Sequence, residues 1–130
     1  MIVLDASAVV DWLLQTSAGQ LIESRIYSRN QTLHAPHLLD LEVTQVLRRL
    51  TQQRVLTGKR ADDALHDLLD LRIQRYPHTV LLPRIWQLRH NLSAYDAAYI
   101  ALAEELAAPV VTRDCRLAST SGHTASIELF

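Results

Sequence analysis

The chain is poor in the residues that build stapled, fibrous or membrane-embedded proteins. Its 130 residues include one cysteine, three glycines, four prolines and one phenylalanine. The single Cys115 excludes an intrachain disulfide and a cysteine-built zinc site, and it is typical of a reducing compartment. No apolar run approaches the ~20 residues of a membrane span, and Asp5 interrupts the N-terminal run too early for a signal peptide. We therefore expect a cytoplasmic protein that does not associate with a membrane.

Charge of either sign is also not in excess. Thirteen Lys and Arg residues against 14 Asp and Glu residues give a net charge of −1, which excludes a protein that coats nucleic acid through bulk charge. The composition is 48% apolar, and a chain of this length buries roughly two-thirds of its unfolded surface. We expect one globular domain spanning residues 1–130.

Short apolar segments alternate with segments of helical periodicity along the chain. The pattern predicts strands at 1–4, 32–35, 79–82, 109–112 and 126–130. It predicts helices at 8–14, 17–29, 37–53, 58–76, 83–90 and 93–108. Helices between successive strands are typical of a parallel sheet covered on both faces. The predicted fold is therefore α/β, a three-layer α/β/α sandwich on a short parallel sheet.

Two aspartates directly follow predicted strands. Asp5 ends the first apolar run, and Asp114 comes two residues after Thr112. Parallel sheets place their ligand crevice beyond the carboxyl ends of the strands, so both acids are expected at one crevice. The alternative is that each merely caps the helix that follows it.

Glu42 lies three residues after Leu39, inside the apolar stripe of its predicted helix. A buried, unpaired carboxylate costs several kcal/mol, so Glu42 must be protonated, paired or bound to a cation. Alternatively, it lies at the rim of the stripe or pairs with Arg48 or Arg49. Asp40 lies on the other side of this helix, and we expect it to be solvated.

Asp96 falls in the first turn of an alanine-rich helix. An acid there suits the helix dipole and complements a cap by Ser93, but Asp96 also lies four residues before Ile100 on a helix that is apolar almost all round. Clustered carboxylates cannot all stay ionised without a counter-charge, and oxygen-only ligands select Mg²⁺ or Mn²⁺ over zinc. The four acids together predict a divalent-cation site.

Four segments of the sequence resemble a known family, the PIN-domain ribonucleases of the VapC toxin type. The segments are Ile-Val-Leu-Asp-Ala-Ser-Ala at 2–8, Leu-Glu-Val at 41–43, Asn-Leu-Ser-Ala-Tyr-Asp-Ala-Ala-Tyr at 91–99, and Val-Thr-Arg-Asp at 111–114 with Leu117. Each segment alone is weak evidence. Their order and separations in a chain of this size make the resemblance specific, and it covers nearly the whole chain.

The resemblance implies both a fold and an activity. The family fold is an α/β/α sandwich on a parallel sheet, and its four acids hold one or two Mg²⁺ or Mn²⁺ ions that cleave RNA phosphodiesters. These acids correspond to Asp5, Glu42, Asp96 and Asp114 here. We expect Asp5, Asp96 and Asp114 to be metal ligands, Asp114 directly or through water. Glu42 either ligates the metal or orients the attacking water, and the products carry a 5′-phosphate and a 3′-hydroxyl.

Further positions near the site follow from the same resemblance. Ser7 and Thr112 match hydroxyls that orient a ligand carboxylate or water, although capping a helix and filling a strand would explain them equally well. Some family members carry another acid two positions after the fourth, where this chain has Arg116. This departure puts a second metal in doubt. We expect Arg113 and Arg116 to contact phosphates of the RNA instead.

The resemblance also implies partners. A ribonuclease toxin would harm its host unless an antitoxin blocked its crevice, and such toxins usually form homodimers or hetero-oligomers with the antitoxin. Apolar stripes on 17–29 and 59–76 are candidate grooves for a partner helix, although packing in the core explains them as well.

Two other functional classes remain as alternatives. A receiver-type signalling domain also has an acidic Mg²⁺ pocket on a parallel sheet, but it needs a lysine after a late strand. The only lysine of this chain is Lys59, at the start of a predicted helix. A catalytically silent PIN domain used for binding is the second alternative, although all four acids are present.

Overall fold

The computed structural model describes all residues from 1 to 130 and contains one five-stranded sheet. The strands are β1 (Ile2–Leu4), β2 (Leu33–Pro36), β3 (Ile73–Tyr76), β4 (Val110–Thr112) and β5 (Ile127–Leu129). Every neighbouring pair is parallel, in the order β3-β2-β1-β4-β5. β1 is thus central, and the carboxyl end of β1 lies beside that of β4.

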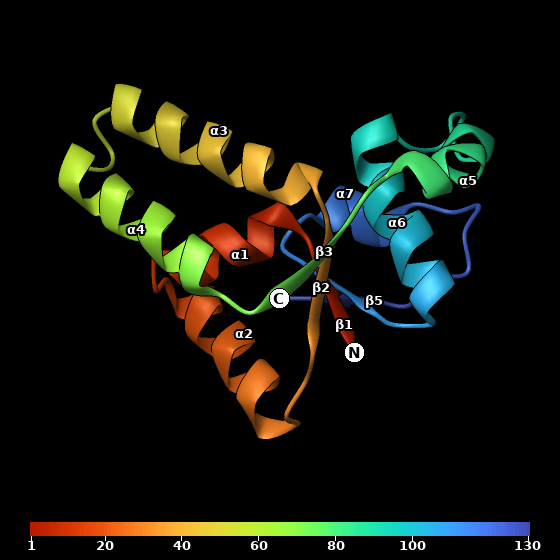
Figure 1. Cartoon of the computed structure of the whole chain (residues 1–130), viewed down its shortest axis with the longest axis horizontal. Helices are drawn as coiled ribbons and strands as arrows, with labels where there is room; N and C mark the ends of the chain where they lie inside the picture. The colour runs from red at the N-terminus through yellow and green to blue at the C-terminus, as the bar shows by residue number, and fades with distance from the viewer.

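Helices cover both faces of the sheet (Figure 1). The helices are α1 (Ala6–Leu13), α2 (Ser17–Ser28), α3 (Leu38–Gln52), α4 (Gly58–Asp70), α5 (Leu82–Gln87), α6 (Ala94–Leu106) and α7 (Cys115–Ser119). Helices α1 to α4 lie on one face, with α3 and α4 side by side, while α5 and α6 lie on the other face. The predicted three-layer α/β/α sandwich is confirmed.

The burial of the central strand β1 and of helix α6 is consistent with a sheet that helices cover on both faces. Ile2, Val3 and Leu4 are fully buried, as expected for a strand with helices on both sides. Seven successive residues of α6, from Ala97 to Ala103, are also buried. Small alanine side chains let α6 approach β1, β2 and β4 closely enough to be enclosed on all sides. No helix of the structure is both long and apolar enough to traverse a bilayer.

The prediction that one helix spans 58–76 is wrong at its C-terminal end. Helix α4 ends at Asp70, and residues 73–76 form the edge strand β3, in which Ile73 pairs with Leu33 of β2. Ile73 comes five residues after Leu68, which breaks the spacing of three or four that a helical stripe requires. Ile73 is buried and the next residue, Gln74, is exposed, as expected for the two-residue alternation of side chains in a strand.

The predicted strand at 79–82 is also wrong. Thr79–Leu81 form a 3₁₀ turn, η1, which leads directly into α5. Pro83 lies in the first turn of α5, where a backbone N–H would have no partner within the helix, so a proline costs no hydrogen bond there. β3 already occupies the position beside β2, and Val80 is 79% exposed rather than buried in the sheet.

Candidate active site

The four predicted acids line one pocket of about 420 Å³. Each comes from a different element: Asp5 follows β1, Glu42 lies on α3, Asp96 lies in the first turn of α6, and Asp114 follows β4. Parallel pairing of β1 with β4 brings the first and last of these to the same edge of the sheet. Residues 109 positions apart in sequence are thereby gathered at one crevice, as the sequence predicted.

Two hydroxyl groups hold the Asp5 carboxylate. Ser7 Oγ and Thr112 Oγ1 both donate to Asp5 Oδ2, at 2.6 and 2.7 Å. Asp5 is only 8% exposed and Thr112 is fully buried, so this orientation is well defined. Asp5 is the N-cap residue of α1, but its side chain makes no capping hydrogen bond. Its carboxylate therefore serves the pocket rather than the helix.

Glu42 meets a partner that the sequence did not indicate. The buried Tyr99 hydroxyl donates to Glu42 Oε2 at 2.5 Å. Burial raises the pKa of Glu42, and the charges of Asp5 and Asp96 add to this effect, while the Tyr99 hydrogen bond opposes it. The alternative of an ion pair with Arg48 or Arg49 is not observed.

Asp96 combines a capping position with a place at the pocket. Its backbone N–H donates to the Ser93 hydroxyl at 3.1 Å, so Ser93 caps α6 as predicted. The carboxylate of Asp96 lines the pocket. Burial raises its pKa, the Ser93 hydroxyl lowers it, and the charges of Asp5 and Asp114 raise it further. Asp96 therefore interacts electrostatically with two other acids of the pocket.

Asp114 is the acid with a cationic neighbour. Partial burial acts to raise its pKa, but hydrogen bonds from the side chain and backbone of Arg116 prevail and lower it. The Asp114 side chain accepts from Arg116 N at 2.8 Å and so caps α7. Both expectations for Asp114, a helix cap and a residue of the crevice, are thus met by one side chain.

The donor set of this pocket fits a hard divalent cation. All four acids offer carboxylate oxygens, which Mg²⁺ and Mn²⁺ prefer. As they stand, however, no three His, Cys, Asp or Glu side chains form a closed metal-binding cluster. Burial and the charges of neighbouring acids raise the pKa of Glu42 and Asp96, and a cation bound between the acids would offset both effects.

The arginines beside the pocket differ in their availability. Arg113 donates to Asp11 Oδ2 at 2.7 Å and to the main-chain oxygen of Phe130, so its guanidinium is already engaged. Arg116 is 93% exposed along its side chain and makes only a longer contact of 3.3 Å with Asp114. Of the two predicted phosphate contacts, Arg116 is the one free to turn toward a ligand.

Two other expectations are decided by ion pairs. The prediction that Asp40 is simply solvated is wrong, because Arg75 Nε donates to it at 2.7 Å. Arg75 belongs to β3, which the sequence analysis placed in a helix, so this pair was not foreseen. Lys59 pairs with Asp63 four residues later on α4 and does not line the acid pocket. The receiver-type alternative therefore lacks its lysine.

The remaining walls of the acid pocket are mostly apolar, and the sequence analysis did not assign them to the site. They come from α1, α3 and the start of α6: Ala6, Leu38, Leu41, Gln45, Val46 and Tyr95. Leu41 and Tyr95 are 75% and 67% exposed. The feature that identifies these residues as part of the site is the exposure of large side chains beside an acidic pocket.

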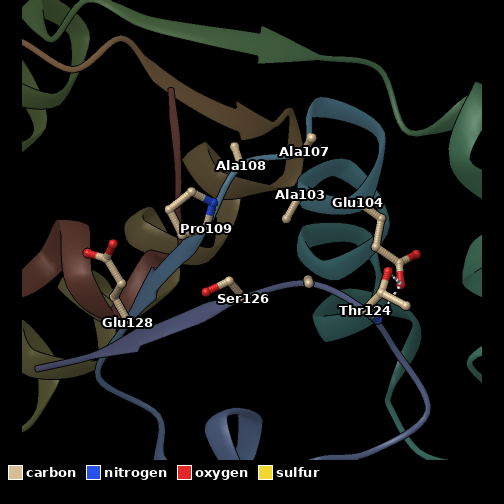
Figure 2. Close-up of a pocket in the computed structure, with 9 residues that line it drawn as sticks. Ala103, Glu104, Ala107, Ala108, Pro109, Thr124, Ser126 and Glu128 are labelled. Carbon is tan, nitrogen blue, oxygen red and sulfur yellow. Dashed lines mark hydrogen bonds between the residues drawn. The ribbon is translucent and has the colours of Figure 1, made fainter.

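A second hollow, of about 410 Å³, lies at the amino-terminal ends of β4 and β5, on the other edge of the sheet (Figure 2). Glu104 and Thr124 lie together at one end of it and Glu128 at the other. Arg84 binds Glu104 through two nitrogens, at 2.7 and 2.9 Å, and lowers its pKa to about 2. Arg25 binds Glu128 in the same way. Both carboxylates are thus held in ion pairs with arginine side chains.

Comparisons with known proteins place the chain in one family. The PIN domain family matches residues 2–122. The chain is 46% identical over 121 residues to ribonuclease VapC9 of Mycobacterium tuberculosis, covering 92% of this chain and 91% of that protein. It is 40% identical over 129 residues to ribonuclease VapC12 of the same organism, covering 99% and 98%. The solved structure of VapBC2 from Rickettsia felis, bound to a DNA fragment from its promoter, shares the fold with a TM-score of 0.73, 13% identity and coverage of 100% and 99%.

The fold, the acidic pocket and these relatives define a class of protein. The chain belongs to the PIN domain family, in its VapC ribonuclease branch.

Proposed function

We propose that this protein is a metal-dependent endoribonuclease, the toxin of a toxin-antitoxin pair, with Mg²⁺ or Mn²⁺ as its cofactor. The observation that carries the proposal is the convergence of Asp5, Glu42, Asp96 and Asp114 on one pocket at the carboxyl edge of the sheet. VapC9 and VapC12, which are named ribonucleases, support the substrate class.

The four acids have separate roles in this proposal. Asp5, Asp96 and Asp114 would hold the cation, and Ser7 and Thr112 keep the Asp5 carboxylate oriented through its Oδ2 atom. Glu42 has a raised pKa and a single strong donor, Tyr99. A carboxylate of raised pKa is suited to take a proton from an attacking water, so we assign Glu42 to orient and deprotonate that water.

Hydrolysis needs charge neutralisation at the phosphate and a reactive water. A divalent cation, when bound, supplies both, because it neutralises phosphate charge and acidifies water. Arg116 is exposed on α7 beside Asp114, and its guanidinium would contact a phosphate oxygen of the RNA. Arg113 would first have to leave Asp11 and is the weaker of the two contacts.

An antitoxin is the partner that we propose, and the cytoplasm, where RNA is found, is the compartment. VapBC2, a structural neighbour, was solved bound to DNA from its promoter. Exposed apolar side chains on α2 and α4, namely Leu21, Tyr27 and Leu69, offer a surface for a partner helix. The apolar stripe is shorter than predicted, since α4 ends at Asp70. A homodimer is the other assembly we propose.

Cleavage of RNA in the presence and absence of a chelator tests the proposal. Purified protein is incubated with structured RNAs in Mg²⁺ or Mn²⁺, and again with EDTA. We expect cleavage only with the metal, and only from protein that carries Glu42. Cleavage that EDTA leaves undiminished would exclude the mechanism. Binding of RNA without cleavage of any RNA in a broad panel would favour the silent PIN domain.

A further inference from the structure

A second, smaller pocket adjoins the acid pocket. It holds about 180 Å³ and lies between the start of α3, the turn before α5 and the first two turns of α6. Leu38, Leu82, Ile85 and Tyr95 form most of its wall, and His78 and the Tyr95 hydroxyl are its polar side-chain groups. No arginine, lysine or carboxylate lines it, in contrast to the acid pocket beside it.

The two pockets share walls. Leu38 and Tyr95 line both of them, so the two spaces adjoin at these side chains. Tyr95 directly precedes Asp96, and neighbouring Cα atoms lie about 3.8 Å apart. Because Tyr95 and Asp96 both line the acid pocket, a base bound against Tyr95 would lie next to a phosphate held at Asp96.

We propose that this apolar pocket receives one nucleobase of the RNA strand, the base next to the phosphate that is cut. The inference rests on the proposed ribonuclease function and names a subsite of it. Tyr95 provides the stacking face, and His78 at the wall provides the hydrogen bond to the edge of the base.

The chemistry of the pocket matches a base better than the other parts of a nucleotide. Nucleobases are flat and uncharged, and proteins that read single-stranded RNA stack them on aromatic side chains. A phosphate would find no cation in this pocket, and a ribose would leave its hydroxyls against leucine and isoleucine. The Tyr95 ring is 67% exposed, so one of its faces is open to such a partner.

Isolated nucleosides test base binding without reference to cleavage. The four nucleosides are titrated into the ¹⁵N-labelled protein, and backbone amide shifts are followed. We expect shifts at residues 94–98 in the wild-type protein. Ala94→Leu, at an exposed position on the pocket wall, should abolish them by filling the space. Tyr27→Ala is the matched control, because Tyr27 is 69% exposed on α2 and lines neither pocket.

Single abasic substitutions test the same subsite in RNA. Removal of the one base next to the cut should raise the KM of the wild-type protein on the order of tenfold, as expected for loss of a stacked base. Tyr95→Ala should raise KM by a similar factor on intact RNA with little change in kcat, and the abasic position should then cost it nothing more. Tyr95→Phe, which keeps the ring, should raise KM much less than Tyr95→Ala does.

The possible outcomes separate this inference from the ribonuclease function. Nucleoside shifts without RNA cleavage support the base pocket and overturn the nuclease alone. Metal-dependent cleavage with no nucleoside shifts, and with an unchanged KM in Ala94→Leu, overturns the base pocket alone. If Ala94→Leu and Tyr95→Ala instead turn a dimer into a monomer while base preference at the cut is retained, a second copy of the chain occupies the pocket, and the inference is wrong.

Discussion

Tyr99 Oη lies 2.5 Å from Glu42 Oε2, and this contact joins the enclosed helix α6 to an acid of the pocket on α3. Tyr99 is fully buried, and the pKa of its hydroxyl is raised by burial and by the charge of Glu42. The tyrosine therefore stays protonated and acts only as a donor. It stabilises the ionised form of a carboxylate whose pKa is raised by burial.

Replacement of Tyr99 by phenylalanine should lower both stability and activity. Loss of a hydrogen bond to a half-buried carboxylate costs about 1–2 kcal/mol of unfolding free energy. It also removes the one contact that lowers the pKa of Glu42, so the acidic limb of the pH–activity profile should move to higher pH. Urea unfolding and a pH–rate series measure the two effects.

Tyr95→Phe is the control, since that hydroxyl makes no protein hydrogen bond and Tyr95 is largely exposed. A Tyr99→Phe protein with wild-type stability and pH profile would contradict this role.

Neutralising any of the four acids should reduce RNA cleavage by about 10²-fold or more. The variants are Asp5→Asn, Glu42→Gln, Asp96→Asn and Asp114→Asn, and circular dichroism checks that each is folded. Asp40→Asn is the matched control on the same helix as Glu42. It breaks the pair with Arg75 and should cost about 0.5–1 kcal/mol of stability while activity is retained. Loss of activity in Asp40→Asn with full activity in Glu42→Gln would reverse the assignment of the two acids.

The hydroxyls that hold Asp5 should matter for metal affinity. Ser7→Ala removes one of the two donors to Asp5 Oδ2, and loss of a group that orients a ligand typically weakens metal binding by 10- to 100-fold. Isothermal titration with Mn²⁺ measures the affinity. Ser24→Ala is the control, because Ser24 only bonds to a backbone carbonyl on α2. Equal Mn²⁺ affinity in both variants would limit Ser7 to a structural role.

Mn²⁺ should stabilise the folded protein. A ligand that binds only the native state at about ten times its Kd adds roughly 1.4 kcal/mol, which corresponds to about 3–6 °C in Tm for a domain of this size. Asp96→Asn should melt higher than the wild type in EDTA, since it relieves repulsion with Asp5 and Asp114, yet gain little from Mn²⁺. If Asp96 served only to support the helix cap, Asp96→Asn would melt lower and keep the full Mn²⁺ shift. Thermal melts of both proteins in EDTA and in Mn²⁺ distinguish these cases.

Metal-free stability should fall as pH rises above the acidic range. The pKa values of Glu42 and Asp96 are raised from 4.5 and 3.8 in the folded protein. Their contribution to stability is complete below those unfolded values and is lost as pH rises through the higher folded ones. Glu104 acts in the opposite sense: its pKa is lowered from 4.5 to about 2, so its contribution is lost as pH falls through that interval.

Urea unfolding in EDTA at about pH 5 and about pH 8 tests this sign. The loss of unfolding free energy between the two pH values should be smaller in Glu42→Gln than in the wild type, because the variant has no carboxyl to titrate. The same loss in both proteins would mean that Glu42 is not destabilised by ionisation.

The positions of the four acids could be predicted because local rules determine them. Asp5 and Asp114 end apolar segments, and in a parallel sheet the ends of such segments share one edge. Glu42 interrupts an apolar stripe and Asp96 starts an alanine-rich helix, so their helical phase alone turned them toward protein. The family resemblance rests on the same four segments and is confirmed by relatives of 40% and 46% identity.

Contacts between distant segments could not be predicted, because no local pattern specifies which side chains meet. Residues 73–76 became a strand since β2 offered an unpaired edge, and this placed Arg75 beside Asp40. Only the arrangement of α6 and α3 around the sheet brings the Tyr99 hydroxyl to Glu42 and sets Tyr95 at two pockets. The sequence by itself determined which residues carry charge to the crevice. The tertiary structure decided which neighbours set their pKa values, because burial and charge depend on distances through space.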